Sequence, residues 1–241
     1  MELSKRLYAV AAMVTPGNIV CDVGCDHGYV SIFLVETKKS PKIYAMDVNK
    51  GPLERAAEHV KEAGLQDYIE LILSDGLIGM PEGKADTLIC AGMGGRLVIK
   101  ILSESMEKVR KMKELILQPQ SELGLVRKYL KEQGFMIDEE DMVKEDGKFY
   151  PILHVCVSHG GSKAKKIADE AKQTVFYKYG ERLLLKKHPV LKEYLLWEEG
   201  LLDQIGVELK KSGSDTEKTK ERLCTLEEDR QLNKEAMKYF E

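Results

Sequence analysis

The sequence predicts an α/β fold, in which a mostly parallel sheet of seven strands is covered by helices and followed by a helical C-terminal domain. Short apolar segments typical of strands alternate with helix-like segments through the first 160 residues. Such alternation favours a parallel sheet with helices on both of its faces. A glycine turn joins the first of these strands to the next helix. The composition then changes at residues 158–162, after which the pattern is helical throughout.

Each expected element follows from a local pattern of apolar residues. The first helix has apolar residues at helical spacing, whereas the strands are short apolar runs bounded by turn residues. The last two strands are joined by the turn EDGKFYP, which leaves no room for a helix, so we expect an antiparallel hairpin there. The elements are, in order, helix 2–13, strand 19–23, helix 28–36, strand 42–47, helix 51–63, strand 69–73, strand 86–91, helix 95–105, strand 113–117, helix 121–133, and strands 135–143 and 151–158.

The apolar pattern of residues 161–241 predicts a second, helical domain. Its apolar residues recur at a spacing of three or four, with Glu198 as the one charged interruption. Lys210 and Lys211 precede a helix stop, and Ser214 or Asp215 would cap the next helix. We therefore expect an antiparallel, coiled-coil-like helical hairpin, preceded by a shorter basic helix. The two apolar stripes are Leu191, Leu195, Leu202, Ile205 and Leu209, and then Leu223, Leu226, Met237 and Phe240.

Composition excludes several classes of protein. No apolar run approaches the roughly 18 residues that a membrane-spanning helix needs, so we expect no membrane segment. The five cysteines are scattered and match no zinc-binding spacing, which predicts no metal site and fits a reducing cytoplasm. Residues 163–192 hold nine Lys and Arg against three acids, a net charge of +6. This basic segment is either a solvated helix face or a surface that contacts phosphates.

The most informative motif is IVCDVGCDHG, at residues 19–28. Asp22 ends an apolar strand, and Gly24 and Gly28 follow in a turn that precedes a helix. Strand, glycine turn and helix together bring backbone close to a nucleotide-like ligand. A carboxylate beside this turn would repel the pyrophosphate of NAD but suits a cation. The motif therefore favours S-adenosylmethionine (SAM), which carries an ammonium and a sulfonium and no phosphate.

Acidic residues also end the second and third strands. Asp47, with Val48 after it, stands where an acid accepts hydrogen bonds from ribose hydroxyls; alternatively it caps a helix. Asp75 and Gly76 follow the third strand, where the acid would meet an adenine amino group; alternatively they form a common Asp-Gly turn. Acids at the ends of three strands together favour a cofactor site.

The fourth strand ends in AGMGG, at residues 91–95. Gly92 and its neighbouring glycines leave room for a ligand against the backbone, and Met93 packs either against the cofactor or in the core. The Asn/Asp-Pro-Pro-aromatic motif, with which many amino-methylating enzymes hold a target amine, is absent. The site therefore favours methylation of a ring nitrogen or another atom over the exocyclic N6 of adenine.

Six segments, in their order and spacing, resemble the bacterial tRNA (adenine-22-N1)-methyltransferases: VCDVGCDHGY, YAMDVNKGPL, LILSDGL, LICAGMGG, LILQPQSE and FYPILHV. The resemblance covers nearly the whole chain, including the helical domain. It implies a Rossmann-like class I methyltransferase domain, SAM as cofactor, and methyl transfer to N1 of an adenine in the tRNA D-arm. Asp26 stands where methyltransferases usually have glycine, and Gln120 where relatives of this family usually have Asn.

Four residues are candidates for contact with the target adenine. Asp26 and His27, at the tip of the glycine turn, would favour the positive charge that develops on the ring. Alternatively, Asp26 caps the following helix and His27 is a turn residue. Tyr29 would stack on a flipped base or pack in the first helical turn. Gln120, after the fifth strand, would read an adenine edge through its amide, and Tyr150 would wall the pocket.

A tRNA substrate needs a wider footprint than the pocket alone. The candidates for contacts to its phosphate backbone are Lys5, Arg6, Lys163, Lys165, Lys166 and Lys172. Two other functions stay open: a SAM-dependent enzyme acting on a small molecule, and a non-catalytic adaptor that binds SAM or RNA. The complete set of Asp22, Asp47 and Asp75 argues against the adaptor, and an NAD-dependent dehydrogenase is a weaker third candidate.

Overall fold

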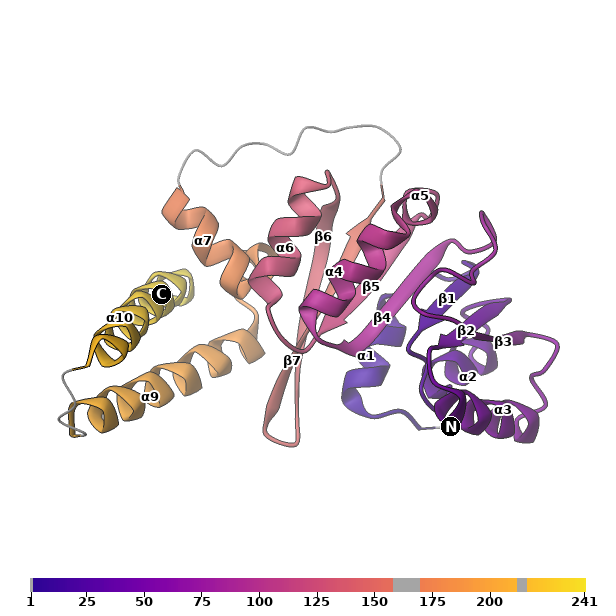
Figure 1. The fold of residues 1–241 in the computed structure, drawn as a ribbon, viewed down its shortest axis with the longest axis horizontal. Coiled ribbons are helices and arrows are strands. Elements are labelled where there is room, and N and C mark those ends of the chain that lie inside the picture. The colour runs from indigo at the N-terminus through magenta and orange to yellow at the C-terminus, as the bar shows by residue number, and fades with distance from the viewer. Residues whose placement is uncertain (1, 158–169, 212–215) are drawn as a thin grey trace. The chain divides into compact units, whose positions relative to one another are not determined.

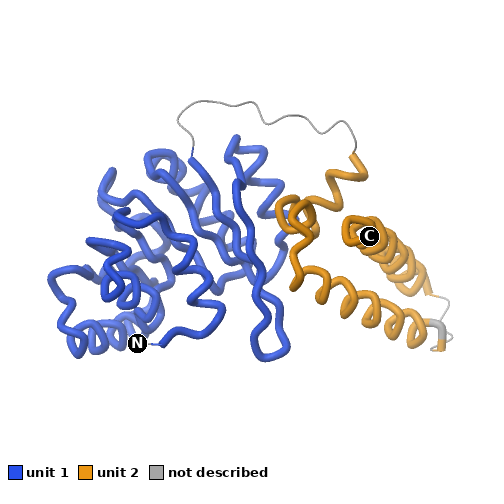
Figure 2. Tube along the Cα trace, turned by 180° about the vertical axis from the view of Figure 1, so that it is seen from behind, with its two compact units in different colours: residues 1–165 blue, residues 166–241 orange. Residues whose placement is uncertain are grey.

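The structure, a computed structural model, describes residues 2–157, 170–211 and 216–241. The chain forms two compact units, residues 1–165 and residues 166–241, which Figure 2 colours separately. The domain boundary expected at residue 160 lies outside the described residues.

The first unit is built on one seven-stranded sheet with the strand order β3-β2-β1-β4-β5-β7-β6 (Figure 1). All pairs of neighbouring strands among β1, β2, β3, β4 and β5 are parallel, whereas β7 runs antiparallel to both β5 and β6. This confirms the predicted fold class. The strands are β1 (Val20–Val23), β2 (Ile43–Asp47), β3 (Ile69–Leu73), β4 (Thr87–Met93), β5 (Glu114–Pro119), β6 (Met136–Glu145) and β7 (Lys148–Cys156).

Six helices cover the two faces of the sheet (Figure 1). Because side chains alternate along a strand, β5 sends Leu115 and Leu117 into the core under α4, α5 and α6. Its intervening Ile116 packs into the opposite core, under α1, α2 and α3. The same alternation turns Gln118 toward α1. These helices are α1 (Lys5–Met13), α2 (Tyr29–Glu36), α3 (Lys50–Glu62), α4 (Gly95–Glu104), α5 (Met106–Val109) and α6 (Leu123–Glu132).

The hairpin of β6 and β7 is tighter than the sequence analysis expects. The turn consists of Asp146 and Gly147 alone, both with positive φ (49° and 74°). Two successive residues with positive φ are typical of the turns that join two antiparallel strands directly. The residues from Phe149 to Pro151 therefore belong to β7 and not to the turn. The expected antiparallel pairing is confirmed, and the expected seven-residue turn is wrong.

The second unit is helical, with α9 and α10 paired. Arg230 Nη2 donates to the carbonyl of Leu202 at 3.3 Å, and Asn233 Nδ2 donates to that of Leu195 at 3.0 Å. Residue numbers rise along one helix as they fall along the other, so the pair is antiparallel. Its elements are α7 (Glu170–Tyr179), α8 (Glu181–Leu185), α9 (Pro189–Lys211), α10 (Glu217–Met237) and a 3₁₀ turn, η1 (Lys238–Phe240).

Two local expectations for this unit need correction. The single short basic helix is two helices, α7 and α8, because the chain breaks at Gly180, whose φ of 95° no helix accommodates. The cap of α10 is Thr216, whose side chain accepts a bond from the Thr219 amide. It is therefore neither Ser214 nor Asp215, which lie outside the described residues.

Glu198, the charged interruption of the apolar stripe, is buried at the centre of this unit. Its carboxylate accepts hydrogen bonds from the hydroxyls of Tyr179 (2.6 Å) and Tyr194 (3.1 Å) and from Asn233 Nδ2 (2.9 Å). A buried carboxylate is tolerated only when its oxygens are satisfied in this way. Lys178 Nζ lies 3.4 Å from the same carboxylate, so this member of the basic segment serves the core of the unit.

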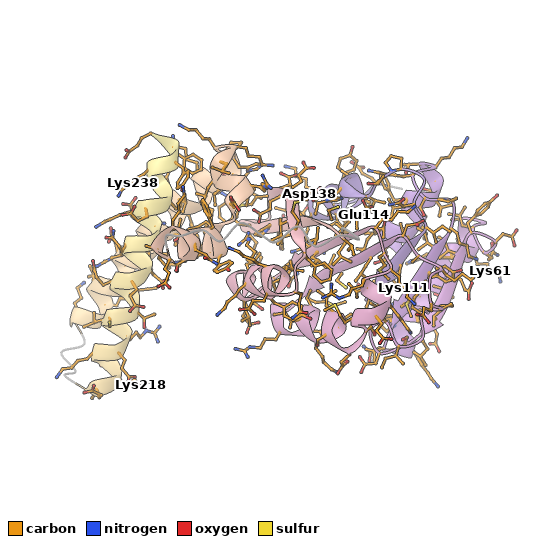
Figure 3. The ribbon with its side chains drawn as sticks, turned by 90° about the horizontal axis from the view of Figure 1, so that it is seen from above. Lys61, Lys111, Glu114, Asp138, Lys218 and Lys238 are labelled. Carbon is orange, nitrogen blue, oxygen red and sulfur yellow. The ribbon has the colours of Figure 1, made fainter. Side chains whose placement is uncertain are left out.

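A second buried carboxylate, Glu114, joins four elements of the first unit. It accepts bonds from the amide and hydroxyl of Thr15, from Thr87 Oγ1 (2.7 Å) and from His154 Nε2 (3.0 Å). His154 Nδ1 lies 2.6 Å from Asp138, and Figure 3 shows Glu114 and Asp138 close together. Burial alone would raise the pKa of Glu114, but these bonds outweigh it and lower the pKa to about 2. The bond to Glu114 raises the pKa of His154 to about 9.

His154→Gln is expected to destabilise the protein most between pH 4.5 and 6.5 and least above pH 9. A raised pKa stabilises the folded state fully below the ordinary histidine value of 6.5, and this contribution is lost as pH rises through about 9. The lowered pKa of Glu114 stabilises above 4.5, and that contribution is lost as pH falls toward about 2. Thermal denaturation of both proteins across this range measures the effect. A difference in Tm that does not change with pH would contradict it.

Candidate active site at the carboxyl edge of the sheet

The residues expected to hold a cofactor all lie at one edge of the sheet. Strands β1 to β5 are parallel, so their carboxyl ends meet there, and the strand order reverses between β1 and β4. In open α/β sheets, ligands bind outside the carboxyl ends at such a reversal point. The residues gathered at this edge are Asp22, Gly24, Gly28, Asp47, Val48, Asp75, Gly76, Gly92 and Met93.

The glycine turn after β1 is held against the end of β2. The amides of Gly24 and Cys25 both donate to the carbonyl of Met46, at 2.8 and 3.0 Å. Gly24 has a φ of 74°, and a Cβ added to it would come within 2.2 Å of Met93 Cε. Met93 therefore lies directly over the turn. The ends of β1 and β4 form one continuous wall of the site.

Asp22 is buried, and its carboxylate is directed at α2. Ser31 Oγ donates to it at 2.7 Å, a partner that sequence reasoning missed. Burial raises the pKa of Asp22; the bond from Ser31 lowers it and the charge of Asp47 raises it again, which gives a pKa of about 6. A cationic ligand beside the turn would stabilise the charged carboxylate. This electrostatic preference matches the one inferred from the motif.

Asp47, the last residue of β2, and Asp75, in the loop after β3, lie in different environments. Asp47 is 8% exposed, and its Oδ1 accepts a bond from the Asn49 amide at 2.8 Å, which shapes the loop. Val48, beside it, is 59% exposed at the same edge. Asp75 is exposed and lies 3.6 Å from Lys100 Nζ on α4. The edge thus offers carboxylates and an apolar side chain, which fit hydroxyl, amino and adenine groups and would repel phosphates.

The end of β4 carries a bulge that opens the adjacent part of the edge. The register between β4 and β5 shifts at Gly92, which has a φ of 80°. The Gly92 amide donates to Gln118 Oε1 at 3.1 Å, and Arg6 Nη1 donates to the same oxygen at 2.9 Å. The Arg6 guanidinium also lies 5.5 Å from the centre of the Tyr150 ring. The Gln120 side chain is exposed, and the backbone N–H of Gln120 donates to the Met93 carbonyl at 2.8 Å.

The first turn of α4 is already occupied by side chains. The Gly95 amide donates to Ser121 Oγ and the Arg96 amide to Glu122 Oε2, both at 3.3 Å. A Cβ on Gly95 would come within 2.5 Å of the Ser121 carbonyl oxygen, so only glycine fits. This helix start is therefore closed to a phosphate. Gly95 therefore serves the close packing of α4 against the loop after β5.

Comparison with known proteins agrees with this geometry. A family model described as a methyltransferase domain matches residues 3–153. The chain is 30% identical to the tRNA (adenine(22)-N(1))-methyltransferase of Bacillus subtilis (strain 168) over 98% of each chain. The chain belongs to this methyltransferase family. The prediction made from the sequence motifs is thereby confirmed.

Solved structures give the same assignment for the whole chain. The B. subtilis M1A22 tRNA methyltransferase superposes with a TM-score of 0.82 at 30% identity, covering 98% of this chain and 99% of that one. A Streptococcus pneumoniae protein in complex with S-adenosyl-L-methionine gives 0.83 at 32% identity, over 98% and 100%. As a member of this methyltransferase family, the chain is a SAM-dependent enzyme with a Rossmann-like fold.

Three of the residues predicted to contact the target base lie against α3 in this methyltransferase. The rings of His27 and Tyr29 are nearly parallel, with centroids 5.4 Å apart, and both stack against His59 at 5.8 and 5.1 Å. Asp26 has a φ of 49° and lies 3.6 Å from His27 and 4.0 Å from Arg55. Gly28 caps α2, so the alternative that Asp26 is the cap is wrong.

The residues expected to bind RNA fall into three groups. Lys163, Lys165 and Lys166 lie outside the described residues. Lys172 is exposed on α7, with its Nζ 5.5 Å from the centre of the Phe176 ring. Lys5 is exposed too, and its backbone amide donates to Glu145. Arg6 is turned toward Gln118, which places it in the site and not on an open basic surface.

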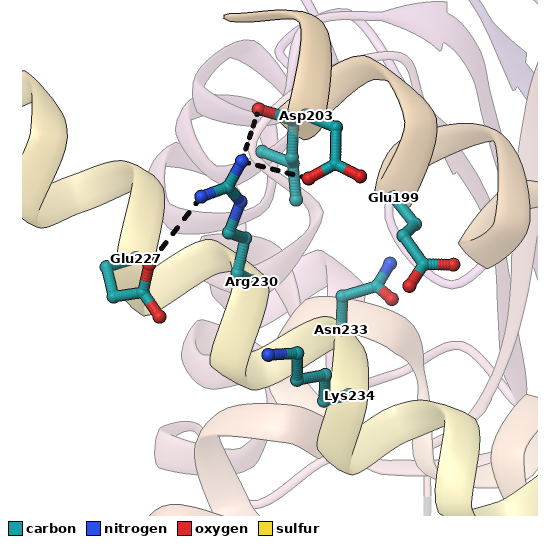
Figure 4. A pocket seen from close by; sticks show the side chains of 7 residues that line it. Glu199, Asp203, Glu227, Arg230, Asn233 and Lys234 are labelled. Carbon is teal, nitrogen blue, oxygen red and sulfur yellow. Dashed lines mark hydrogen bonds and ion pairs between the residues drawn. The ribbon is translucent and has the colours of Figure 1, made fainter. Parts of the chain in front are cut away.

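The helical unit has a separate pocket of about 300 Å³ between α9 and α10 (Figure 4). Its Arg230 pairs with Asp203 at 2.9 Å and with Glu227 at 3.7 Å. Three acids against two bases do not favour a phosphate there. The lining residues are Glu199, Leu202, Asp203, Glu227, Arg230, Asn233 and Lys234.

The described ranges contain neither a metal-binding cluster nor a membrane-spanning helix. No group of three His, Cys, Asp or Glu residues there is placed to hold a metal ion. None of the described helices combines the length and apolar character needed to cross a bilayer.

Proposed function

We propose that this protein transfers the methyl group of SAM to N1 of adenine 22 in the D-arm of tRNA. The observation that carries the proposal is the full-length similarity to the B. subtilis enzyme, which includes the helical unit. In a SAM enzyme for a small molecule, that unit would instead be a lid or a dimer arm. A tRNA substrate also implies a cytoplasmic location, in keeping with five free cysteines.

The carboxyl edge supplies the cofactor contacts. Asp47 accepts hydrogen bonds from the ribose hydroxyls, and Val48 and Asp75 hold the adenine ring and its amino group. Gly24 and Gly28 keep the turn after β1 free of side chains, and Asp22 stabilises that turn and the nearby positive charge. When bound there, SAM supplies an electrophilic methyl group.

The reaction needs positioning more than proton transfer. N1 of adenine carries a free lone pair at neutral pH, so no strong general base is required. The protein must expose N1, align it and exclude water, and such positioning contributes many kcal/mol. Positive charge develops on the adenine ring, which the carboxylate of Asp26 favours. N1 is engaged in Watson-Crick pairs, so the target base must be unpaired or extruded.

Primer extension on an unmodified tRNA incubated with enzyme and SAM tests this function. Methylation at N1 blocks base pairing, so we expect a stop at position 22 that appears only with SAM. A tRNA in which guanine replaces adenine 22 is the control. If the enzyme consumes SAM but leaves tRNA unmodified, the small-molecule function replaces this one. SAM binding without any turnover would support the adaptor.

We further propose that the basic segment, residues 163–192, contacts the tRNA backbone. Neutralising phosphates releases counterions, so affinity should fall steeply with salt. Changing Lys163, Lys165, Lys166 and Lys172 together to Ala should weaken tRNA binding and make the salt slope shallower. SAM affinity should stay unchanged. Filter binding across a salt series measures both quantities, and a slope and affinity equal to wild type would mean that this face is only solvated.

A further inference from the structure

Gln118 is a buried amide with one unsatisfied end. The side chain is fully buried at the carboxyl end of β5. Its Oε1 accepts hydrogen bonds from Arg6 Nη1 and from the Gly92 amide. Its Nε2 is buried without a hydrogen-bond partner among the residues that the structure describes. Buried polar groups are nearly always satisfied, so this one requires an explanation.

The orientation of the amide follows from its neighbours. Reversing it would set the NH₂ group against two donors, the Arg6 guanidinium and the Gly92 amide, so the oxygen must face them. Both lone pairs of Oε1 are then in use. Gln118 can therefore offer a ligand only one kind of contact, an N–H donor.

The position of this donor is beside the cofactor residues and separate from them. Asp22 and Asp47 belong to β1 and β2, and Asp75 lies in the loop after β3, whereas Gln118 lies on β5, next to the bulge of β4. The nearest atoms to an added Gly92 Cβ are Arg6 Nη1 at 3.4 Å and Gln120 Nε2 at 3.9 Å. Arg6 is held in place by Gln118 and Tyr150, whereas Gln120 Nε2 is the end of an exposed, flexible side chain, which can move aside for a ligand.

We propose that Gln118 Nε2 donates a hydrogen bond to a ring nitrogen of the target adenine, N3 or N7. The inference rests on the proposed function and deepens it. N1 must keep its lone pair for attack on the methyl group, and the N6 amino group is a donor. N3 and N7 are the remaining acceptors of the base. A neutral ring nitrogen also costs far less to bury beside this amide than a phosphate does.

Gln118 would then help set specificity for the base. Gln118 Nε2 can donate to a ring nitrogen only when the N3 or N7 edge of the purine faces β5. Arg6 acts as a positioning residue, because it holds Oε1 and so fixes the direction of Nε2. Tyr150 in turn supports the Arg6 guanidinium.

The test uses tRNA in which adenine 22 is replaced by 3-deazaadenine or by 7-deazaadenine, each of which keeps N1 and loses one acceptor. Wild-type enzyme should lose about tenfold in kcat/KM on one analogue and little on the other, the size expected for one hydrogen bond. Gln118→Glu removes the donor and keeps an oxygen for Arg6 and Gly92. On natural tRNA, the kcat/KM of this variant should be about tenfold lower than that of wild type. On the analogue to which wild type is sensitive, the variant should show no further loss in kcat/KM.

SAM affinity, measured by calorimetry, should be unchanged in Gln118→Glu. A loss of SAM affinity would assign the amide to the cofactor and overturn the inference. Equal rates of wild-type enzyme on adenine and both analogues would also overturn it, whether or not the variant folds. If wild-type enzyme leaves N1 of adenine 22 unmethylated, the proposed function fails and the inference fails with it. If the enzyme methylates adenine 22 and both analogues at equal rates, the inference about Gln118 fails while the proposed function stands.

Discussion

Asp47→Ala is expected to weaken SAM binding by about 1–3 kcal/mol, because it removes the carboxylate that we propose accepts hydrogen bonds from the ribose. The side chain is buried at the carboxyl end of β2, and its Oδ1 already holds the Asn49 amide at 2.8 Å. Binding should occur without RNA, since the acids lie at one edge of a single unit. Calorimetry of enzyme and SAM alone measures the loss.

Asp47→Asn is the matched control for this prediction. It keeps an oxygen for the Asn49 amide, and so preserves the loop, while it removes the charge and one acceptor. Its SAM affinity should fall between those of wild type and Asp47→Ala, with an unchanged Tm. Wild-type affinity in Asp47→Ala would exclude Asp47 as a ribose ligand.

Glu140→Ala is expected to lower the free energy of unfolding by about 3–5 kcal/mol, the cost of removing one partner from a buried ion pair. Arg127 of α6 and Glu140 of β6 are 3% and 1% exposed, and Arg127 Nε donates to Glu140 Oε1 at 2.8 Å. Without this carboxylate, the guanidinium stays buried and loses the opposite charge of Glu140. Urea denaturation measures the change.

Two variants separate burial from charge in this pair. Lys128→Ala breaks an exposed pair with Glu132 on the same helix, where N and O are 3.9 Å apart, and should cost at most about 0.5 kcal/mol. Replacing both Arg127 by Met and Glu140 by Leu should recover much of the stability, because no charge is then left buried. A loss below about 1 kcal/mol in Glu140→Ala would mean that the guanidinium is satisfied by other groups.

The residues at the carboxyl edge of the sheet could be predicted because short-range sequence patterns determine them. Each parallel strand is recognisable in the sequence as a short apolar run. Because the carboxyl ends of parallel strands share one edge of the sheet, the residues at these ends must lie at that edge. Asp22, Asp47 and Asp75 are therefore found together in the structure. The composition of the motifs also separates a cationic cofactor from a phosphate, since that choice depends on the charge of a few neighbouring residues.

The hairpin of β6 and β7 marks the limit of such local reasoning. Pro151 suggests a turn, because proline cannot donate to a sheet ladder. In the structure it pairs with Met142 on β6, while the pairing of β7 with β5 reaches only Leu153. Pro151 thus lies beyond the ladder with β5, where β7 has β6 as its one neighbour and a strand tolerates proline. Which neighbour a strand has at each residue is decided by the assembled sheet.

The side of the site that we propose binds the base was decided by the tertiary structure. Arg6 and Gln118 are 112 residues apart in the chain, and their contact exists because α1 packs on the face of β5 that carries Ile116 and Gln118. In the same way, His27 and Tyr29 stack against His59 because α3 covers the turn after β1. The sequence by itself determined the order of strands and helices and the acids at the cofactor edge, because short-range patterns encode them. The direction of Arg6, Gln118, His27 and Tyr29 depends on which distant helix covers each face, and only the packing of the whole unit specifies that.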